Sequence, residues 1–333
     1  MKPQKVSKNL LQLMDSAYIV KDPLGVVLII SPWNYPVMLL YLPMVGALAA
    51  GNTVLLKPSE IASHTAALTA ELVPKYFDPD VVQVAQGGAS DTSELLKERF
   101  DHIFFTGAPR VGKILMEAAS KFLTPVTLEL GGKCPAIVDS NCDLRVVARR
   151  LAWGKFMSCG QTCLAPDYIL CLPNIQEKLI ESLKTAVKEY YGENPQEARD
   201  YSRIISERHF DRLLPLINSS GSIAFGGKHD KKDLYIEPTV LVNVNSSDPV
   251  MQEEIFGPIF PIINVKSVQE AIELVNEGEK PLAVYIFSKE QRTIDHVLKH
   301  TSSGGVTVND VILHISRKFG EIIVSDDIRI SIN

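Results

Sequence analysis

The sequence predicts an α/β protein built on a parallel, doubly wound sheet. Val26–Ile30 is an uninterrupted apolar run, too short for a helix and typical of a strand buried on both faces. Strand-like and helix-like segments then alternate as far as Leu130, which is the pattern of repeated βα units. With 333 residues, of which 46% are hydrophobic, the chain is long enough for two domains with substantial cores.

The elements of the first half follow from residues that begin and end helices. After the first strand, Ser31–Pro36 predicts a turn, and Pro36 at the first helical position opens a helix that ends at Gly51. The remaining segments of this half alternate in type. We expect strands at Thr53–Leu56, Val81–Val84, His102–Phe105 and Val126–Leu130, and helices at Thr65–Tyr76, Asp91–Glu98 and Val111–Lys121.

A second α/β pattern begins after Leu130-Gly131-Gly132, which we interpret as the boundary between two domains. Beyond this boundary we expect helices at Leu144–Phe156, Ile175–Tyr190 and Val268–Glu277, and strands at Tyr168–Leu172, Thr239–Val244 and Val284–Phe287. Asn194-Pro195 and Gly226–Asp230 predict surface turns.

The charge balance points to a small-molecule partner. The formal net charge is -5, so nothing predicts the basic face that nucleic acid or an anionic membrane would need. Pro23–Leu56 carries no charge, but its prolines and the turn at Ser31–Pro36 argue against a membrane span. The 5 cysteines are odd in number and too few for a disulfide scaffold, and the N-terminus lacks a secretory pattern. We therefore expect a cytoplasmic protein.

A glycine-bounded segment, Gly107-Ala108-Pro109-Arg110-Val111-Gly112, follows a predicted strand and precedes a predicted helix. Free backbone N–H groups at such a position can hold a phosphate. The segment is not the dinucleotide-binding G-x-G-x-x-G, which this sequence lacks. It matches a P-loop as far as Lys113, but Ile114 stands where a P-loop needs Ser or Thr for Mg²⁺. A turn without a ligand is the alternative.

Two cysteines, Cys159 and Cys163, lie on either side of Gly160-Gln161-Thr162 after a predicted helix. A zinc site would need four ligands in paired short spacings, and no such His or Cys cluster accompanies them, so we expect no metal. A cysteine hydrolase would need a histidine base, and none of the 7 histidines lies in a recognisable setting. For an isolated cysteine, burial in the core is the alternative.

Two acidic motifs are further candidates. Glu129 ends an apolar strand before two glycines, a setting that would raise its pKa and suit a general base. An ion pair with Lys133 is the alternative. Gln252–Pro258 places adjacent carboxylates before a turn, and on its own could equally be a solvated loop.

Six short motifs occur in order along the chain: Pro32-Trp33-Asn34, Lys57-Pro58-Ser59-Glu60, Phe105-Thr106-Gly107 with Gly112, Glu129-Leu130-Gly131-Gly132-Lys133, Gly160-Gln161-Thr162-Cys163 and Glu254-Ile255-Phe256-Gly257-Pro258. Taken together, these motifs resemble those of the NAD(P)-dependent aldehyde dehydrogenases, where they occur in the same order. The flanking residues are most similar to the class 3 family, and closest to its B branch, from about Lys8 to Ile315.

The resemblance implies an aldehyde dehydrogenase-like fold, with a Rossmann-type parallel-sheet cofactor domain and an α/β catalytic domain. Residues 1–24 would form an N-terminal and bridging segment. The NAD-binding domain would span residues 25–131 and the catalytic domain residues 132–315. Residues 316–333 would be a divergent C-terminal tail.

The resemblance also assigns catalytic roles. Cys163 would attack the aldehyde as a thiolate, and the Asn34 amide and the Cys163 backbone N–H would bind the resulting oxyanion. After hydride transfer to the nicotinamide, Glu129 would activate water to hydrolyse the thioester. The reaction would need no metal, and Cys159 would be a neighbouring structural thiol.

The implied cofactor is NAD, with NADP possible. Thr106, Gly107 and Gly112 would border the pyrophosphate, and Glu254 with Phe256 the nicotinamide. Because the Glu60 carboxylate would oppose a 2′-phosphate, we favour NAD. The full set of expected cofactor residues is Lys57, Glu60, Thr106, Gly107, Ala108, Pro109, Arg110, Val111, Gly112, Leu130, Gly131, Glu254 and Phe256.

The implied substrates are medium-chain, long-chain or aromatic aldehydes, and the implied assembly is a homodimer. Relative to class 3 proteins, the sequence resembles a product truncated at both ends, without the family's N-terminal helical region and different after Ile315. An inert variant that pairs with full-length relatives is therefore the main alternative. Ile330–Asn333 offers no cysteine for the lipid anchor associated with the B branch, so we expect no membrane anchor.

Overall fold

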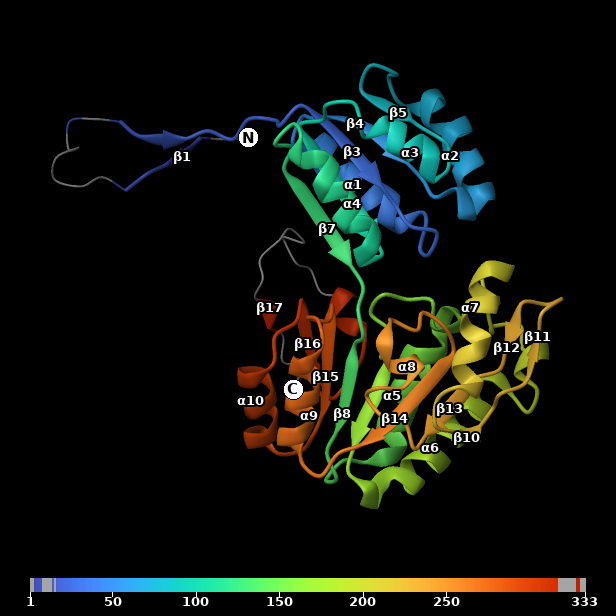
Figure 1. The fold of residues 1–333 in the computed structure, drawn as a ribbon. Coiled ribbons are helices and arrows are strands. Elements are labelled where there is room, and N and C mark those ends of the chain that lie inside the picture. The colour runs from blue at the N-terminus through green and yellow to red at the C-terminus, as the bar shows by residue number, and fades with distance from the viewer. Residues whose placement is uncertain (1–2, 8–13, 15, 317–327, 330–333) are drawn as a thin grey trace. The chain divides into compact units, whose positions relative to one another are not determined.

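The computed structural model describes residues 3–7, 14, 16–316 and 328–329 (Figure 1). The chain divides into two compact units, Met1–Leu130 and Gly131–Asn333. This division falls one residue before the predicted domain boundary. Most of the predicted tail, residues 316–333, lies outside the described residues.

The first unit contains a sheet in which every neighbouring pair of strands is parallel, in the order β5-β4-β3-β6-β7. Its strands are β3 (Val26–Ile30), β4 (Thr53–Lys57), β5 (Val82–Val84), β6 (His102–Gly107) and β7 (Val126–Leu130). Its helices are α1 (Met38–Ala49), α2 (Ser63–Tyr76), α3 (Ala89–Leu95) and α4 (Pro109–Ser120), with a 3₁₀ turn η2 (Glu60–Ala62).

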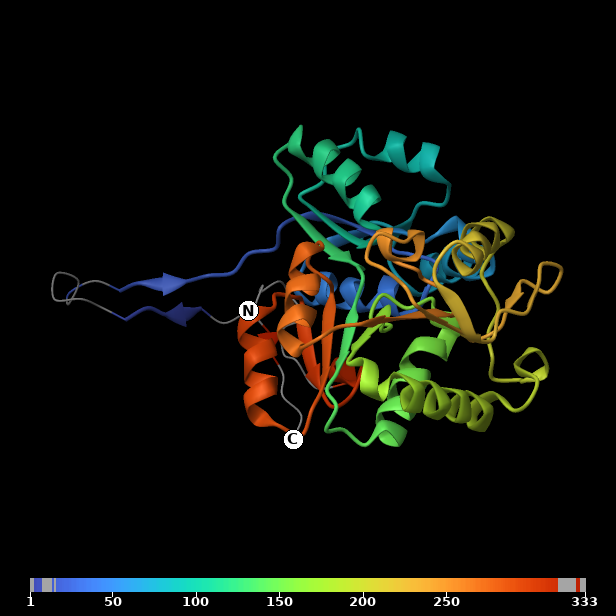
Figure 2. The same cartoon turned by 60° about the horizontal axis from the view of Figure 1, so that its bottom comes forward.

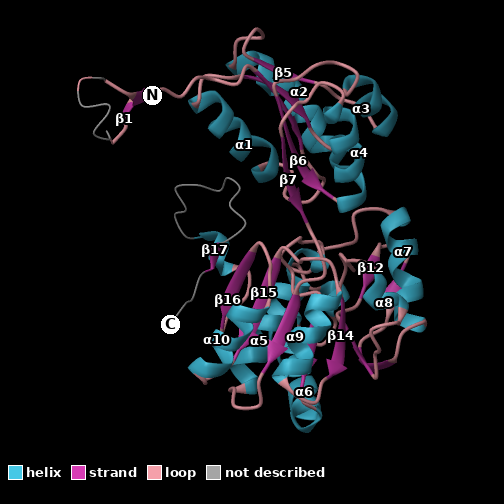
Figure 3. Ribbon diagram, turned by 60° about the vertical axis from the view of Figure 1, so that its left-hand side comes forward, coloured by secondary structure: helices cyan, strands magenta, loops and turns pink. Residues whose placement is uncertain are grey.

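Two hydrophobic clusters cover the two faces of this sheet. Val27 and Ile29 pack with Leu40 of α1, while Leu28 and Ile30 pack with residues of α4 on the other face. Figure 3 shows α1 and α4 on opposite sides of β6 and β7. Successive strand residues point to opposite faces, so an all-apolar strand needs a cover on both. The prediction of a buried parallel sheet is confirmed.

A short antiparallel ribbon precedes this sheet. Strands β1 (Gln4–Lys5) and β2 (Tyr18–Ile19) pair with Gln4 opposite Ile19, and Figure 2 shows them side by side. None of the described helices is long and apolar enough to cross a membrane. The charge-free segment is instead divided among β3, a turn, α1 and the start of β4.

The second unit contains a larger sheet in the order β10-β13-β14-β9-β8-β15-β16-β17, parallel except for the β10–β13 pair. Its strands are β8 (Pro135–Val138), β9 (Tyr168–Cys171), β10 (Ser222–Phe225), β13 (Thr239–Val242), β14 (Ile259–Asn264), β15 (Ala283–Phe287), β16 (Gly305–Val308) and β17 (Ile328–Arg329). Its helices are α5 (Leu144–Phe156), α6 (Pro173–Tyr191), α7 (Glu207–Asn218), α8 (Pro249–Gln252), α9 (Val268–Glu277) and α10 (Gln291–His300). The remaining elements are η3 (Met157–Gly160), η4 (Pro195–Glu197), η5 (Leu313–Ser316) and the pair β11 (His229–Asp230) and β12 (Tyr235–Ile236).

Every element expected from the sequence is present, with ends shifted by a few residues, apart from one turn. His229–Asp230, expected to lie in a turn, forms strand β11, which pairs with β12. Several elements of the second unit were not predicted, among them β8 and β14. Pro135 begins β8 and Pro261 lies inside β14, and proline argues against a central strand because it has no N–H to donate.

Candidate active site

The candidate residues of the first unit lie at the carboxyl ends of neighbouring parallel strands. Lys57 ends β4 opposite Ile30 of β3, and Thr106 of β6 is paired with Glu129 of β7. In a doubly wound sheet, ligands bind outside this edge at the point where the strand order reverses. Here the order reverses between β3 and β6. The sheet register therefore brings these residues to the edge expected of a nucleotide site.

Asn34 lies in the turn that leads from β3 into α1. The backbone N–H of Ser31 donates to the carbonyl of Lys57 over 3.1 Å, which extends the β3–β4 ladder to the start of this turn. Tyr35 takes a left-handed conformation, with φ 48°, and α1 begins at Met38 rather than at Pro36 as predicted. Asn34 is half-buried and follows the same carboxyl edge.

The Lys57 side chain is buried and paired within its own motif. Its ammonium donates to a carboxylate oxygen of Glu60 and to the carbonyl of Pro58, each over 3.2 Å. Ser59 caps the following 3₁₀ turn by accepting from the N–H of Ile61. The Glu60 carboxylate is exposed, so the motif presents a fixed acceptor, which suits the hydroxyl groups of a ribose.

The N-terminus of α4 has the features of a phosphate-binding turn. Ala108 is its N-cap and supplies no side-chain hydrogen bond, and Pro109 occupies the first turn. A Cβ atom on Gly112 would lie 3.2 Å from a methyl group of Leu130, so glycine lets the helix pack closely on β7. Arg110 and Val111 are exposed in the same turn. The N–H groups of Val111 and Gly112 already donate to the carbonyl of Ala108, so the attraction that this turn offers a pyrophosphate is the positive end of the helix dipole.

Glu129 lies near the end of β7, where burial raises the pKa of its carboxyl group. Lys133, the alternative ion-pair partner of Glu129, makes its hydrogen bonds within the second unit. The Lys133 ammonium donates to Asp167 over 2.6 Å and to the carbonyls of Val250 and Glu253 over 3.0 and 3.1 Å. An ammonium has three donors, and these three contacts use all of them.

Cys163 follows a sharply reversed segment at the end of α5. Ser158, Cys159 and Gly160 all have left-handed backbone angles, with φ of 52°, 57° and 73°. A Cβ atom on Gly160 would lie 2.2 Å from the carbonyl oxygen of Gly257, so only glycine allows the two loops to approach this closely. Cys163 itself is half-buried.

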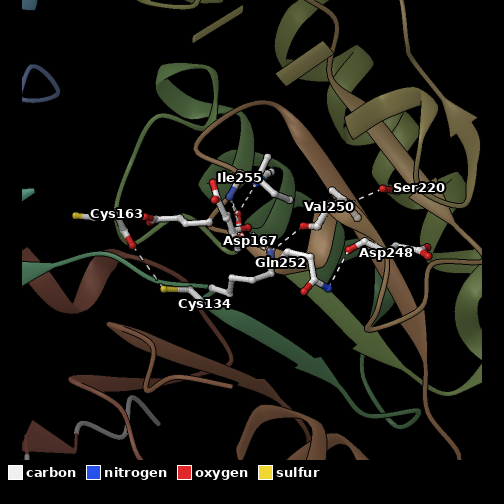
Figure 4. A network of polar contacts seen from close by, with 12 residues as sticks. Cys134, Cys163, Asp167, Ser220, Asp248, Val250, Gln252 and Ile255 are labelled. Carbon is white, nitrogen blue, oxygen red and sulfur yellow. Dashed lines mark hydrogen bonds and ion pairs between the residues drawn. The ribbon is translucent and has the colours of Figure 1, made fainter. Parts of the chain in front are cut away.

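Cys159 differs from Cys163 in its surroundings. Its thiol is buried and lies 3.5 Å from the hydroxyl of Tyr201, and burial raises its pKa to about 12. A thiol of this kind stays protonated at neutral pH and is a poor nucleophile. The carbonyl oxygen of Cys163 accepts a hydrogen bond from the Cys134 thiol over 3.5 Å (Figure 4).

Glu254 lies against the backbone at the start of the second unit. A Cβ atom on Gly131 would be 2.4 Å from a carboxylate oxygen of Glu254. Burial, followed by the charge of Asp167, raises the pKa of Glu254 to about 8, while the N–H of Gly132 opposes this shift. The loop is solvated only at its start, since Gln252 and Glu253 are exposed whereas Ile255 is fully buried.

Phe256 follows Glu254 with a left-handed φ of 50°. Arg212 of α7 donates to the carbonyls of Glu254 and Ile255, which fixes the backbone just before it. Within the second unit, Gly131, Glu254, Phe256 and the Cys163 loop are therefore linked by direct packing.

Asp167 and Lys155 are polar residues of this region that the sequence analysis did not select. The Asp167 side chain is 4% exposed and that of Lys155 is fully buried, with 3.4 Å between carboxylate oxygen and ammonium. Burial lowers the pKa of Lys155. The sequence feature that could have pointed to Asp167 is its position directly before the apolar strand Tyr168–Cys171, where a charged side chain is unusual.

Comparison with known proteins places this geometry in a family. Residues 3–320 match the model of the aldehyde dehydrogenase family. The chain is 56% identical over 311 residues to "Aldehyde dehydrogenase family 3 member A2" of Macaca fascicularis, covering 93% of this chain and 64% of the relative. It is also 56% identical over 313 residues to "Aldehyde dehydrogenase, dimeric NADP-preferring" of Rattus norvegicus, covering 94% of this chain and 69% of that protein.

A solved structure agrees with these relatives. The substrate-bound state of Staphylococcus aureus AldH superposes with a TM-score of 0.92 at 42% identity, covering 95% of this chain and 69% of that chain. The chain spans only part of the length of these proteins, 64% for the macaque relative. From the strand-edge motifs, the Cys163 and Glu254 loops and these matches together, the chain belongs to the aldehyde dehydrogenase family, as the class 3 resemblance of its sequence predicted.

Proposed function

We propose that this chain oxidises medium-chain, long-chain or aromatic aldehydes to carboxylic acids with NAD(P)⁺. The observation that carries the proposal is the contrast between two cysteines of one loop. Cys159 is buried with its pKa raised to about 12, whereas Cys163 is half-buried after a left-handed turn and beside the Glu254 loop. Membership of the aldehyde dehydrogenase family supports the same reaction.

Cys163 is the proposed nucleophile. Its thiolate forms a C–S bond with the aldehyde carbon, and the carbonyl oxygen becomes an oxyanion. The side-chain amide of Asn34 and the backbone N–H of Cys163 are the proposed donors to this oxyanion. A bound nicotinamide cofactor would supply a hydride acceptor at that carbon; loss of the hydride would oxidise the substrate by two electrons and leave a thioester on Cys163.

Glu129 is the proposed general base for the second half of the reaction. Its carboxylate takes a proton from water, whose oxygen attacks the thioester carbon; the C–S bond breaks and the Cys163 thiolate is restored. The raised pKa of Glu129 favours this role, because a base works best when its pKa approaches the operating pH.

The proposed cofactor contacts belong to the strand edge of the first unit and the Glu254 loop of the second. Lys57 and Glu60 suit a ribose, and the start of α4 suits a pyrophosphate, as argued above. Glu254 and Phe256 are proposed to contact the nicotinamide side. The exposed carboxylate of Glu60 disfavours a 2′-phosphate, which favours NAD over NADP, although the rat relative is named NADP-preferring.

We also propose an assembly and a location for the chain. The rat relative is named dimeric, which supports a homodimer. The charge balance and cysteine content of the sequence support a cytoplasmic protein.

The test is NAD(P)H formation by the purified chain with a medium-chain aldehyde. We expect steady turnover that is lost in Cys163→Ala and kept in Cys159→Ala, its matched control four positions earlier. A cooperatively folded chain with no turnover would contradict the proposal and favour an inert member of the family.

A further inference from the structure

A buried ionic cluster of Lys133, Asp167 and Lys155 lies in the second unit and has no role in the function proposed above. We call it the Asp167 cluster. Lys133 and Lys155 approach the two carboxylate oxygens of Asp167 to 2.6 and 3.4 Å, and the exposed fractions of the side chains are 18% for Lys133, 4% for Asp167 and 0% for Lys155. Burying three charges is costly unless each is paired and hydrogen-bonded. We therefore expect the cluster to fix the conformation of the backbone segments that are hydrogen-bonded to it.

The cluster binds the backbone on both sides of Glu254. The carbonyl of Glu253, just before it, accepts from the Lys133 ammonium over 3.1 Å. The N–H of Ile255, just after it, donates to both oxygens of Asp167, over 3.2 and 3.3 Å. The Asp167 and Ile255 contact is visible in Figure 4. Glu254 is thus held between two residues that are each anchored to the same cluster.

The same cluster fixes the backbone on which the Glu254 carboxylate rests. The N–H of Asp167 donates to the carbonyl of Cys134 over 2.7 Å, and Lys133 belongs to the cluster itself. Lys133 and Cys134 directly follow Gly131 and Gly132 in the chain, and the Glu254 side chain packs against these two glycines. Hydrogen bonds therefore connect Asp167 both to the backbone beside Glu254 and to the segment against which the Glu254 side chain packs.

We propose that Asp167, acting with Lys133, is a positioning residue that sets the place of Glu254 for cofactor binding. The inference rests on the proposed function, in which Glu254 contacts the nicotinamide side of the cofactor. Asp167 is not proposed to touch the cofactor or a reacting atom. It acts on Glu254 indirectly, through its hydrogen bond from the N–H of Ile255 and through its ion pair with Lys133. Removing its negative charge takes the counter-charge away from Lys133 and Lys155 and weakens the acceptor for the N–H of Ile255.

The test is a double-mutant cycle on NADH affinity, measured by titration of the full chain. We expect Asp167→Asn and Glu254→Gln each to weaken NADH binding about tenfold, and the double variant to bind within about twofold of Glu254→Gln alone. Such non-additivity is what a residue acting through Glu254 produces. Effects that multiply, or an Asp167→Asn variant that binds NADH as the wild type does, would overturn the proposal.

Controls separate this inference from a loss of fold. Asp211→Asn makes the same chemical change in an exposed pair with Lys231 and should leave NADH binding unchanged. If Asp167→Asn fails to fold, Lys133→Gln is used in the same cycle, because it removes the ammonium that links Asp167 to the Glu253 carbonyl.

A second measurement does not depend on the cofactor. Amide hydrogen exchange of residues 250–258 should be faster in the Asp167→Asn or Lys133→Gln variant than in the wild type, and unchanged in Asp211→Asn. Unchanged exchange would overturn the positioning role even if the wild type bound no NADH. A wild type that binds no NADH, with faster exchange in the variants, would instead contradict the proposed function and keep the positioning role.

Discussion

The two units hold their candidate residues by different physical means. In the first unit, Lys57, Thr106 and Glu129 lie at strand ends, so the backbone register of the parallel sheet sets their spacing. In the second unit, Cys163 and Glu254 lie on loops that depend on glycines and on the buried Asp167 cluster. A sheet register survives most single side-chain changes, whereas a loop held by a buried charge does not. Supporting residues of the second unit should therefore be the more sensitive to substitution.

The largest effect on stability is expected from Asp167→Ala. It leaves Lys133 and Lys155 buried without a counter-charge, which should cost the second unit about 3–5 kcal/mol of unfolding free energy. Urea denaturation followed by tryptophan fluorescence in a Trp33→Phe background reports on this unit, because Trp153 is then the only tryptophan.

The control is Asp211→Ala in the exposed pair with Lys231, for which we expect no measurable loss. Equal losses in the two variants would mean that the Asp167 cluster contributes no more than a surface ion pair, and the contrast between the units would fail.

The next effect compares one glycine from each unit. Gly160→Ala forces a side chain onto a φ of 73° and within 2.2 Å of the Gly257 carbonyl, so we expect a loss of about 1–3 kcal/mol. Gly112→Ala meets methyl groups of Leu130 and Leu128, the nearest at 3.2 Å, which can shift, and should cost less. Thermal unfolding of both variants gives the order, and a reversed order contradicts this prediction.

Glu254 should give the second unit a pH dependence. Its pKa is raised from 4.5 to about 8, so the folded chain holds this proton more tightly than the unfolded chain does. Stability relative to Glu254→Gln should then fall as pH rises from about 4.5 to about 8 and level off above that range. Unfolding free energies of both proteins across this range test the sign; a difference that rises with pH would be incompatible with a buried carboxyl.

The smallest effect is expected in the first unit. Gly46 lies inside α1, and a Cβ atom there would have no neighbour within 4 Å. Gly46→Ala should stabilise this unit by about 0.5–1 kcal/mol, because alanine loses less backbone freedom in a helix. Fluorescence of Trp33 in a Trp153→Phe background follows this unit, and a loss of stability would show that the helix face is already in contact with another group.

The fold of the first unit could be predicted because local signals agree there. Val26–Ile30 is apolar throughout, and glycine or proline marks most of the turns between elements. In the second unit, Pro261 inside β14 contradicts the strand that surrounds it, and tertiary packing overrides the local signal.

The candidate site divides in the same way. Cys163, Glu129 and Glu254 stand in short motifs that the sequence displays. The Asp167 cluster joins residues that are distant in the chain, and nothing local to Asp167 says that Lys133, Lys155 and the Ile255 N–H will meet there. Long-range pairing of buried charges is a property of the folded chain, which a single sequence does not display.

The most direct test of the account is the mass of the Glu129→Gln variant after incubation with an aldehyde and NAD⁺. We expect one adduct, heavier by the aldehyde less two hydrogen atoms and mapped to Cys163, because the thioester forms and is then not hydrolysed. The adduct should be absent without NAD⁺ and absent in Cys163→Ala. No adduct in a folded Glu129→Gln protein, or an adduct on Cys159, would contradict the assignment of Cys163 and Glu129 as nucleophile and base.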